Sequence, residues 1–207
     1  MLSVLRRLFT RRTEDAILEI WCGLGNPGAK YHGNRHNIGF LILDAIAEDH
    51  NFPAWKTQFK GLTTTGLING RKILVLKPST FMNESGQAVQ AALSFYKLSL
   101  NDLTVLHDEL DLAPGKVRVK TGGGLAGHNG LRSINKLCGG PDFHRIRLGI
   151  GHPGHKDRVA SYVLSDFAKT EHDVRDDMIN GISRHADLLA DERRDLFQTR
   201  VSEYIAN

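Results

Sequence analysis

The 207-residue sequence predicts an α/β fold, in which a single globular domain has a mixed, twisted β-sheet flanked by helices. The main observation is that short apolar, strand-like segments alternate with amphipathic, helix-like segments along the whole chain. A hydrophobic content of 41% is enough for a sizeable core, and no repeat or low-complexity segment divides the chain. We therefore expect residues 16–207 to form one domain, preceded by a flexible basic extension over residues 1–15.

The first half of the chain contains three strand signals and two helix signals. Residues 17–22 form a short apolar run that ends at glycine, which favours a strand. Asn69-Gly70 separates the strand-like runs 62–68 and 71–76, a strong signal for a hairpin with a type I′ turn. Helices are expected from about Asn37 and over residues 85–96, the second with Phe95 and Tyr96 facing inward. The inward face of the first helix is expected to consist of Ile38, Leu41, Ile42, Ala45 and Ile46.

The second half continues this alternation. Strands are expected at 103–106, 117–120 and 145–150, and a helix begins near Asn129 after the loop Gly122-Gly-Gly124. Near the C-terminus, helical spacing predicts one face of a long helix composed of Val174, Met178, Ile182, His185 and Leu189.

The basic residues are distributed unevenly, so the formal net charge of +4 understates the local charge. Residues 1–12 hold four arginines and no acid, and the rest of the chain carries 23 basic and 23 acidic residues. Residues 113–147 contain seven basic residues and a single acidic residue, Asp142. This zone lies around a glycine-rich loop and fits the footprint of a polyanion, although basic strands and helices are also common as plain solvated surface. The basic members are Lys116, Arg118, Lys120, Arg132, Lys136, Arg145 and Arg147.

Composition also indicates the cellular compartment in which the protein is expected. No segment approaches the ~18 apolar residues of a membrane span, so no membrane association is expected. Cys22 and Cys138 form no C-x-x-C or zinc pattern, which favours reduced thiols in a cytoplasmic protein. The arginine-rich start also has the composition of a transit peptide, which leaves a mitochondrial address open.

The segment Gly23-Leu-Gly-Asn-Pro-Gly28 matches the dinucleotide-binding pattern G-x-G-x-x-G, but its context does not. A dinucleotide fold needs the last glycine on a helix that faces the pyrophosphate, whereas Pro27-Gly28 predicts a turn. The acidic residue expected about 20 positions further on, at the end of a second strand, is missing. We therefore expect no dinucleotide, and no other cofactor.

Three further polar clusters follow predicted strands or loops: 77–86, 107–111 and 127–130. Ligand sites in open α/β sheets gather at such strand ends. Contiguous acids at a turn are more often solvated than metal-binding, so no metal is predicted from His107, Asp108, Glu109 and Asp111. The histidine, carboxylate and amide groups of these clusters instead suit hydrolysis by an activated water molecule. The sequence has no G-x-S-x-G motif, so it does not indicate a covalent serine nucleophile.

These motifs together resemble the bacterial-type peptidyl-tRNA hydrolase family. The resemblance rests on Gly23–Gly28 with Tyr31 and Arg35-His36-Asn37, on Lys77-Pro-x-Thr-Phe-Met-Asn83-x-Ser-Gly86, on His107–Asp111 and on Gly127–Leu131. It extends through 143–154 and covers nearly the whole chain from about residue 17. Two departures are Asn34 in place of the usual threonine and Leu125-Ala126 in place of the usual His-Gly.

The resemblance implies an activity and a set of site residues. The activity is hydrolysis of the ester between a peptide, or an N-blocked aminoacyl group, and tRNA. His36 is implied as the catalytic base, Asp108 as its supporting carboxylate and Asn26 as the residue that distinguishes blocked from free amino groups. The implied substrate-binding and tRNA-binding residues are Tyr31, Phe81, Asn83, Asn129, Met82, His128, Lys120 and Arg147. The implied partner is peptidyl-tRNA, bound by a monomer.

Plainer interpretations of several of these residues remain open. Asn26 in Asn-Pro-Gly could be only a turn residue, and Asn83 and Asn129 could be helix N-caps. His107 and His128 could each simply hold a loop. The alternative function is RNA binding without catalysis by a protein of the same fold. Such a protein would not need His36 and its carboxylate.

Overall fold

The computed structural model describes residues 17–207. The predicted extension over residues 1–15 lies outside the described residues. Seven strands form one mixed sheet with the order β2-β3-β4-β1-β5-β7-β6. The four central strands are parallel: β1 (Glu19–Gly23), β4 (Arg71–Pro78), β5 (Leu103–Glu109) and β7 (His144–Gly149). The outer strands pair antiparallel with their neighbours: β2 (Lys56–Gln58), β3 (Gly61–Ile68) and β6 (Val117–Thr121).

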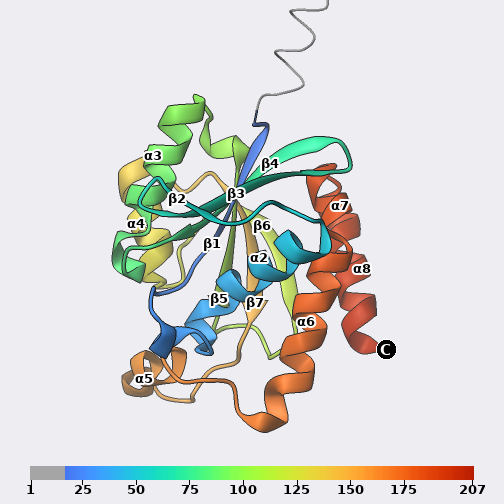
Figure 1. Ribbon diagram of the computed structural model, residues 1–207. Coiled ribbons are helices and arrows are strands. Elements are labelled where there is room, and N and C mark those ends of the chain that lie inside the picture. Colours follow the sequence, from blue (N-terminus) through green and yellow to red (C-terminus); the bar gives the residue numbers. More distant parts are fainter. Residues whose placement is uncertain (1–16) are drawn as a thin grey trace, which may run out of the picture.

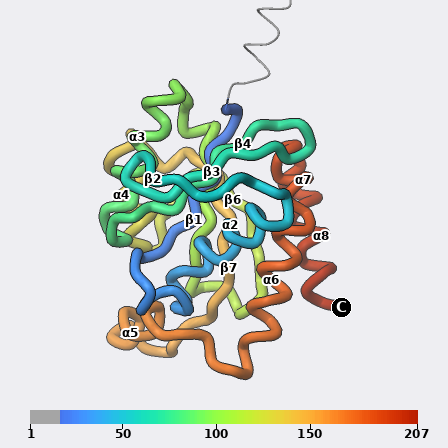
Figure 2. The backbone as a smooth tube through the Cα atoms, in the orientation of Figure 1, coloured from blue at the N-terminus to red at the C-terminus, as the bar shows by residue number. Residues whose placement is uncertain are grey.

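Helices cover both faces of this sheet (Figure 1). One face carries α2 (Ile38–Asp49), α6 (His172–Arg184), α7 (Ala186–Ala190) and α8 (Arg194–Ala206). The other face carries α3 (Gly86–Tyr96) and α4 (Asn129–Cys138). The short helix α5 (Val159–Val163) lies at one end of the sheet, and the tube in Figure 2 shows it beside the chain that follows β1. The predicted α/β fold is confirmed, with a single domain.

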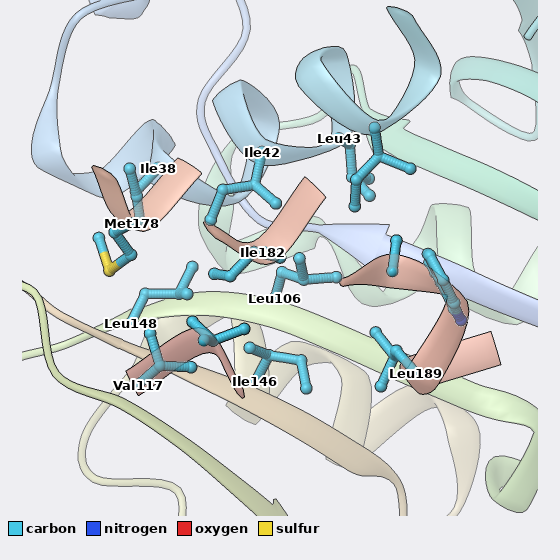
Figure 3. Close-up of a cluster of buried hydrophobic side chains, with 14 of the residues drawn as sticks. Ile38, Ile42, Leu43, Leu106, Val117, Ile146, Leu148, Met178, Ile182 and Leu189 are labelled. Atoms are coloured by element: carbon cyan, nitrogen blue, oxygen red, sulfur yellow. The ribbon is translucent and has the colours of Figure 1, made fainter. Parts of the chain in front are cut away.

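The two faces of the sheet give two hydrophobic cores. The larger core lies between α2, α6 and the strands β5, β6 and β7, where Leu106, Ile146 and Leu148 meet Ile42 and Ile182 (Figure 3). The smaller core joins β1, β4 and β5 to α3 and α4. Because alternate residues of a strand point to opposite faces, these strands supply both cores.

The hairpin between β3 and β4 confirms the turn prediction. Asn69 and Gly70 have φ angles of 48° and 76°, the two positive values that a type I′ turn requires. Among the described residues, no helix is long and apolar enough to cross a membrane.

Three details differ from the sequence prediction. The helix expected to run from Val174 to Leu189 is interrupted at His185, so that α7 is a separate turn that contacts β3. Val174 is 36% exposed, and Phe95, expected to face inward, is 64% exposed and packs edge-on against Tyr96. The periodic pattern could not show these features because they depend on which neighbours the helices meet.

Strand β2 and helices α5 and α8 were missing from the prediction. Strand β2 is fully exposed and polar, so it carries no hydrophobic signal. Helix α8 buries only Phe197 and Val201 on an otherwise mixed surface, which leaves almost no apolar periodicity to recognise.

Candidate active site

The polar motifs separated in the sequence meet at the carboxyl end of the parallel strands. The loop after β1 carries Asn26, and the short 3-10 helix Arg35–Asn37 that leads into α2 carries His36. Strand β5 ends with Asp108, and His128 immediately precedes α4. This is the edge of an open α/β sheet where ligand sites are expected.

Close backbone contact between α2 and the sheet places His36 at this edge. A Cβ atom on Gly39, in the first turn of α2, would lie 2.4 Å from the carbonyl oxygen of Leu106 in β5. A Cβ atom on Gly23 would lie 2.4 Å from the carbonyl oxygen of Gly39. Glycine is thus required on both sides of this contact. Gly23, the first residue of the apparent cofactor pattern, serves helix packing, and Gly28 forms the predicted turn with φ 106°.

His36 and Asp108 form the central pair of the site. The Nδ1 atom of His36 lies 2.8 Å from Oδ1 of Asp108, with the two side chains 12% and 2% exposed. An ionised carboxylate only accepts hydrogen bonds, so Nδ1 of His36 must carry the proton in this pair. The lone pair of Nε2 then remains available, since no hydrogen bond within residues 17–207 uses it. This is the tautomer that a general base needs.

His128 donates to the same carboxylate oxygen. Its Nε2 lies 3.0 Å from Oδ1 of Asp108, while its Nδ1 accepts the backbone N–H groups of Gly130 and Leu131 at 3.1 and 3.4 Å. Accepting at Nδ1 forces the proton onto Nε2, so this tautomer too is defined by its partners. His128 is therefore the N-cap of α4, and neither Asn129 nor Asn83 makes a side-chain cap. His128 thus has the loop-holding role considered for it, and it also lies beside Asp108 and His36.

The two imidazoles keep Asp108 charged. Burial alone would raise the pKa of this carboxyl, but the electrostatic attraction and hydrogen bonds of the two imidazoles outweigh it and hold the pKa well below its usual range. An ionised Asp108 can stabilise a positive charge that develops on His36.

His107 supports this cluster from beneath. It is 1% exposed, its Nδ1 donates to the backbone carbonyl of Asp108 at 2.8 Å, and its ring meets that of His128 edge to face. Burial, followed by the nearby His128, lowers its pKa to about 3, so His107 is neutral. The sequence did not predict this role, since only its position beside Asp108 in the motif marked it.

Asn26 is locked in place by two neighbours. Asn37 closes a pair of hydrogen bonds with the Asn26 backbone, both 2.9 Å long, and Oδ1 of Asn26 accepts the backbone N–H of Met82 at 2.9 Å. These hydrogen bonds use the backbone and Oδ1 of Asn26 and leave its amide Nδ2 as a donor for another partner. Asn37 was not predicted to act here; the run of four polar residues before the helix was the only signal.

Met82 differs from its predicted place in the cleft. Its side chain is 5% exposed and belongs to the core under α3 and α4, so it contributes its backbone N–H to Asn26 rather than a surface to the pocket beside His36. Its neighbours Phe81 and Asn83 are exposed, Phe81 to 57%. The bond from Met82 to Asn26 thus holds both of them near the end of β1.

A pocket of about 440 Å³ opens beside His36. Asn129, Gly127 and Ala126 form one wall, and α5 forms the opposite wall with Val159 and Val163. Ala126 has φ 46°, a left-handed conformation that favours glycine, and Leu125 packs against the smaller core. Of the two departures noted here, Ala126 therefore lies on the rim of the pocket, whereas the Leu125 side chain packs into the core.

Arg35 fastens the α5 wall to the segment that carries His36. Its guanidinium donates to the hydroxyl of Ser165 at 2.8 Å and to Glu171 at 2.5 Å, and it stacks over Tyr162 at 4.3 Å. The neighbouring Asn34 donates to Asp166 at 2.7 Å. The sequence showed Arg35 only as part of the motif, because its partners lie more than 120 residues away.

The basic zone divides into surface and buried groups. Lys120 is exposed, and Arg147 is partly exposed with its Nε donating to Glu109 at 2.9 Å. Arg145 is 1% exposed, and its guanidinium binds the carbonyl oxygens of Gly122 and Gly124. Arg145 therefore holds the glycine loop and does not belong to a surface footprint.

The acidic cluster considered for a metal is not brought together, since Glu109 pairs with Arg147 and His107 lies in the core. Within residues 17–207, the candidate metal ligands that do lie together are His36, Asp108 and His128. Their facing atoms already satisfy one another through hydrogen bonds, and both nitrogens of His128 are used. Cys22 and Cys138 are free, and burial raises the pKa of Cys138 to about 11, so neither thiol has the character of a nucleophile.

An α/β domain with a histidine–carboxylate pair, an available imidazole nitrogen and amide donors fits the class of hydrolases that activate water. Comparison with known proteins agrees. The family model of peptidyl-tRNA hydrolase matches residues 20–206. The peptidyl-tRNA hydrolase of Roseobacter denitrificans is 56% identical over 185 residues, covering 89% of this chain and 79% of that protein.

A second relative, from Novosphingobium aromaticivorans, is also 56% identical and covers 89% of this chain and 96% of its own length. The crystal structure of peptidyl-tRNA hydrolase from Acinetobacter baumannii superposes with a TM-score of 0.84 at 38% identity, covering 90% of this chain and 95% of that one. The chain belongs to the peptidyl-tRNA hydrolase family and is a hydrolase of that class.

Proposed function

We propose that this chain hydrolyses the ester between a peptide and tRNA, with His36 as the general base. The observation that carries the proposal is the Nδ1–Oδ1 hydrogen bond between His36 and Asp108, which leaves Nε2 of His36 ready to take a proton. The family membership supplies the reaction. A protein that only bound RNA would have no use for an imidazole oriented in this way by a buried carboxylate.

The reaction follows from these positions. Nε2 of His36 removes a proton from water, and the hydroxide attacks the ester carbonyl to give a tetrahedral oxyanion. Amide groups, for which we propose Asn83 and Asn129, donate to the substrate oxygens. The intermediate then collapses, the ribose oxygen leaves with the proton held on His36, and free tRNA and peptide acid are released. Asp108 stabilises the imidazolium between the two proton transfers.

Asn26 supports selection of N-blocked substrates. Its Oδ1 is occupied by Met82, so only the Nδ2 donor faces the substrate. A peptide or acetyl carbonyl can accept from this donor, whereas a free ammonium group would place one donor against another and lose its solvation. This contrast would protect ordinary aminoacyl-tRNA from hydrolysis.

The tRNA is proposed to approach from the β7–β6 side. In the register of the two strands, Arg118 stands opposite Arg147, and Lys120 stands opposite Arg145. Since opposite residues share a face and alternate residues of a strand do too, Lys120 and Arg147 lie on the same face of the sheet. Phosphate groups would be drawn to this side by their negative charge. Tyr31, Phe81 and His128 complete the proposed contacts around the ester.

We also propose that the enzyme works as a monomer, without a metal or other cofactor, in the cytoplasm. The hydrogen bonds within His36, Asp108 and His128 support catalysis without a metal, because binding an ion would have to break them. The relatives compared above are bacterial proteins and give the mitochondrial alternative no support.

The test is to incubate the purified protein with N-acetyl-aminoacyl-tRNA and, separately, with unblocked aminoacyl-tRNA in the presence of a chelator. We expect release of tRNA from the blocked substrate only. Release from neither substrate would refute the proposed reaction, and activity that required added metal would refute the metal-free mechanism.

A further inference from the structure

A second groove lies on the other side of Asn26 from the pocket beside His36. It measures about 550 Å³ and is bounded by the ends of β3 and β4, the loop after β1 and the first turn of α2. Most of its surface is apolar. The apolar lining residues are Pro27, Ala29, Phe40, Leu62 and Pro78. The mechanism above gives it no role. We call it the β4 groove.

The β4 groove carries little free charge. Lys77 lines it, but its ammonium group is paired with Asp44 and lies over the ring of Trp55 at 4.1 Å. Leu62 stands directly opposite Lys77 in the strand pairing and is 38% exposed. An exposed leucine beside a neutralised lysine favours an apolar ligand over a phosphate chain.

The order of strands places this groove opposite the tRNA side. Along the carboxyl edge, the sheet runs from β3 and β4, through β1 with Asn26 and β5 with Asp108, to β7 with Arg147 and to β6. Lys120 in β6 stands opposite Arg145, further from this edge than Arg147. The His36–Asp108 pair therefore lies between an apolar groove and a basic face. The substrate has the same polarity, because its scissile ester joins a peptide on one side to a polyanion on the other.

We propose that the β4 groove is a binding site for apolar side chains of the peptide, at residues upstream of the ester-linked one. The proposal rests on the proposed function, since it assumes that His36 attacks the ester. Asn26 lines the groove, and the Met82 N–H uses its Oδ1 but not its Nδ2 donor. A peptide whose carbonyl accepts from this donor would continue into the groove. The site would give longer apolar peptides lower KM values than an acetylated single residue.

The experiment compares three substrates on the intact enzyme: N-acetyl-glycyl-tRNA, N-acetyl-dileucyl-glycyl-tRNA and N-acetyl-diaspartyl-glycyl-tRNA. For the native enzyme we expect kcat/KM for the dileucyl substrate to exceed that for the glycyl substrate about fivefold to tenfold, mainly through KM, from partial burial of leucine side chains. The diaspartyl substrate should gain nothing.

Leu62→Lys supplies the decisive variant, because it places a charge in the groove at an exposed strand position. Within this variant, the preference should shift from the dileucyl to the diaspartyl substrate. Leu67→Lys is the matched control, since Leu67 lies on the same strand, is 60% exposed and does not line the groove. It should keep the native ratios.

The outcomes separate the two proposals. Failure of the native enzyme to cleave any of the three substrates would refute the proposed function itself. Cleavage of all three with equal kcat/KM, or unchanged ratios in Leu62→Lys, would overturn the peptide site alone. A uniform improvement of all three substrates in Leu62→Lys would indicate that RNA phosphate passes the groove, and would also overturn it.

Discussion

At the scale of single residues, the site depends on hydrogen bonds whose direction is forced by their partners. Asp108 accepts from both His36 and His128, and His128 accepts two backbone N–H groups at its other nitrogen. Each tautomer thus follows from the charge of Asp108 and the start of α4. The chemistry of His36 is prepared before any substrate binds.

The carboxylate can be tested by Asp108→Asn. The amide keeps the size of the side chain but removes the negative charge that would stabilise the His36 imidazolium. We expect kcat to fall by roughly 10²- to 10⁴-fold, as is typical when a catalytic imidazole loses its carboxylate, with KM little changed. Steady-state kinetics on N-acetyl-aminoacyl-tRNA measure this, and full activity would remove Asp108 from the mechanism.

The donor of Asn26 can be tested by Asn26→Asp. The new carboxylate can still accept the Met82 N–H, but it replaces the Nδ2 donor with an acceptor. Activity on the blocked substrate should fall about tenfold or more, and unblocked aminoacyl-tRNA should gain relative to it, since an ammonium group can now be bound. The ratio of the two rates is the readout. An unchanged ratio would show that discrimination lies elsewhere.

At the scale of elements, the site is assembled by segments that the sequence keeps far apart. Arg35 joins the His36 segment to Ser165 and Glu171, and thereby positions the α5 wall of the pocket. Lysine cannot reproduce this, because only the planar guanidinium can stack over Tyr162 while reaching both partners.

We therefore expect Arg35→Lys to loosen α5. Amide hydrogen exchange over residues 159–163 should accelerate, and KM should rise about tenfold with a smaller change in kcat. Arg175→Lys is the control, because Arg175 on α6 lies over the ring of Phe167 and pairs with Asp176 rather than with the His36 segment. Equal effects of the two variants would contradict a specific anchor.

The basic residues on β6 and β7 lead to a separate prediction about how tRNA affinity depends on salt concentration. Lys120→Ala should reduce the slope of log affinity against log salt by about one unit, because one phosphate contact is lost. Lys56→Ala, on exposed strand β2 at the opposite edge of the sheet, should leave the slope unchanged. Binding of deacylated tRNA between low and moderate salt measures both. Equal slopes for Lys120→Ala and the native protein would remove Lys120 from the tRNA path.

At the scale of the whole molecule, the buried histidine centre links stability to pH. The folded-state pKa of His107 is lowered to about 3, below its ordinary value of 6.5, so the unfolded chain binds a proton first as pH falls. The stability contributed by neutral His107 is complete above about pH 6.5 and is lost progressively toward pH 3. The depressed pKa of Asp108 acts in the same direction below its ordinary value of 3.8.

Urea unfolding at pH 7, 6 and 5 should therefore show a falling free energy of unfolding, with His107 contributing at most about 1.4 kcal/mol per pH unit below its unfolded pKa. His107→Asn, which does not titrate, should show a shallower decline than the native protein. Identical pH dependence in the two proteins would show that His107 is not the linked group.

The sequence predicted the parts of this molecule that local patterns encode. The apolar alternation gave the central strands, Asn69-Gly70 gave the hairpin, and the motif residues converged at one sheet edge as expected. It could not show that His128 caps α4 while binding Asp108, that Arg145 is buried under the glycine loop, or that Arg35 anchors α5. Those roles depend on partners distant in the chain, which no periodicity records.

The central claim is that Nε2 of His36 activates the attacking water. Its most direct test is a single-turnover measurement of tRNA release from N-acetyl-aminoacyl-tRNA by His36→Ala, together with binding of the same substrate. We predict that the rate falls by at least about 10³-fold while affinity changes little, because His36 contributes chemistry rather than the tRNA contacts. Release at a rate near that of the native enzyme would contradict the account.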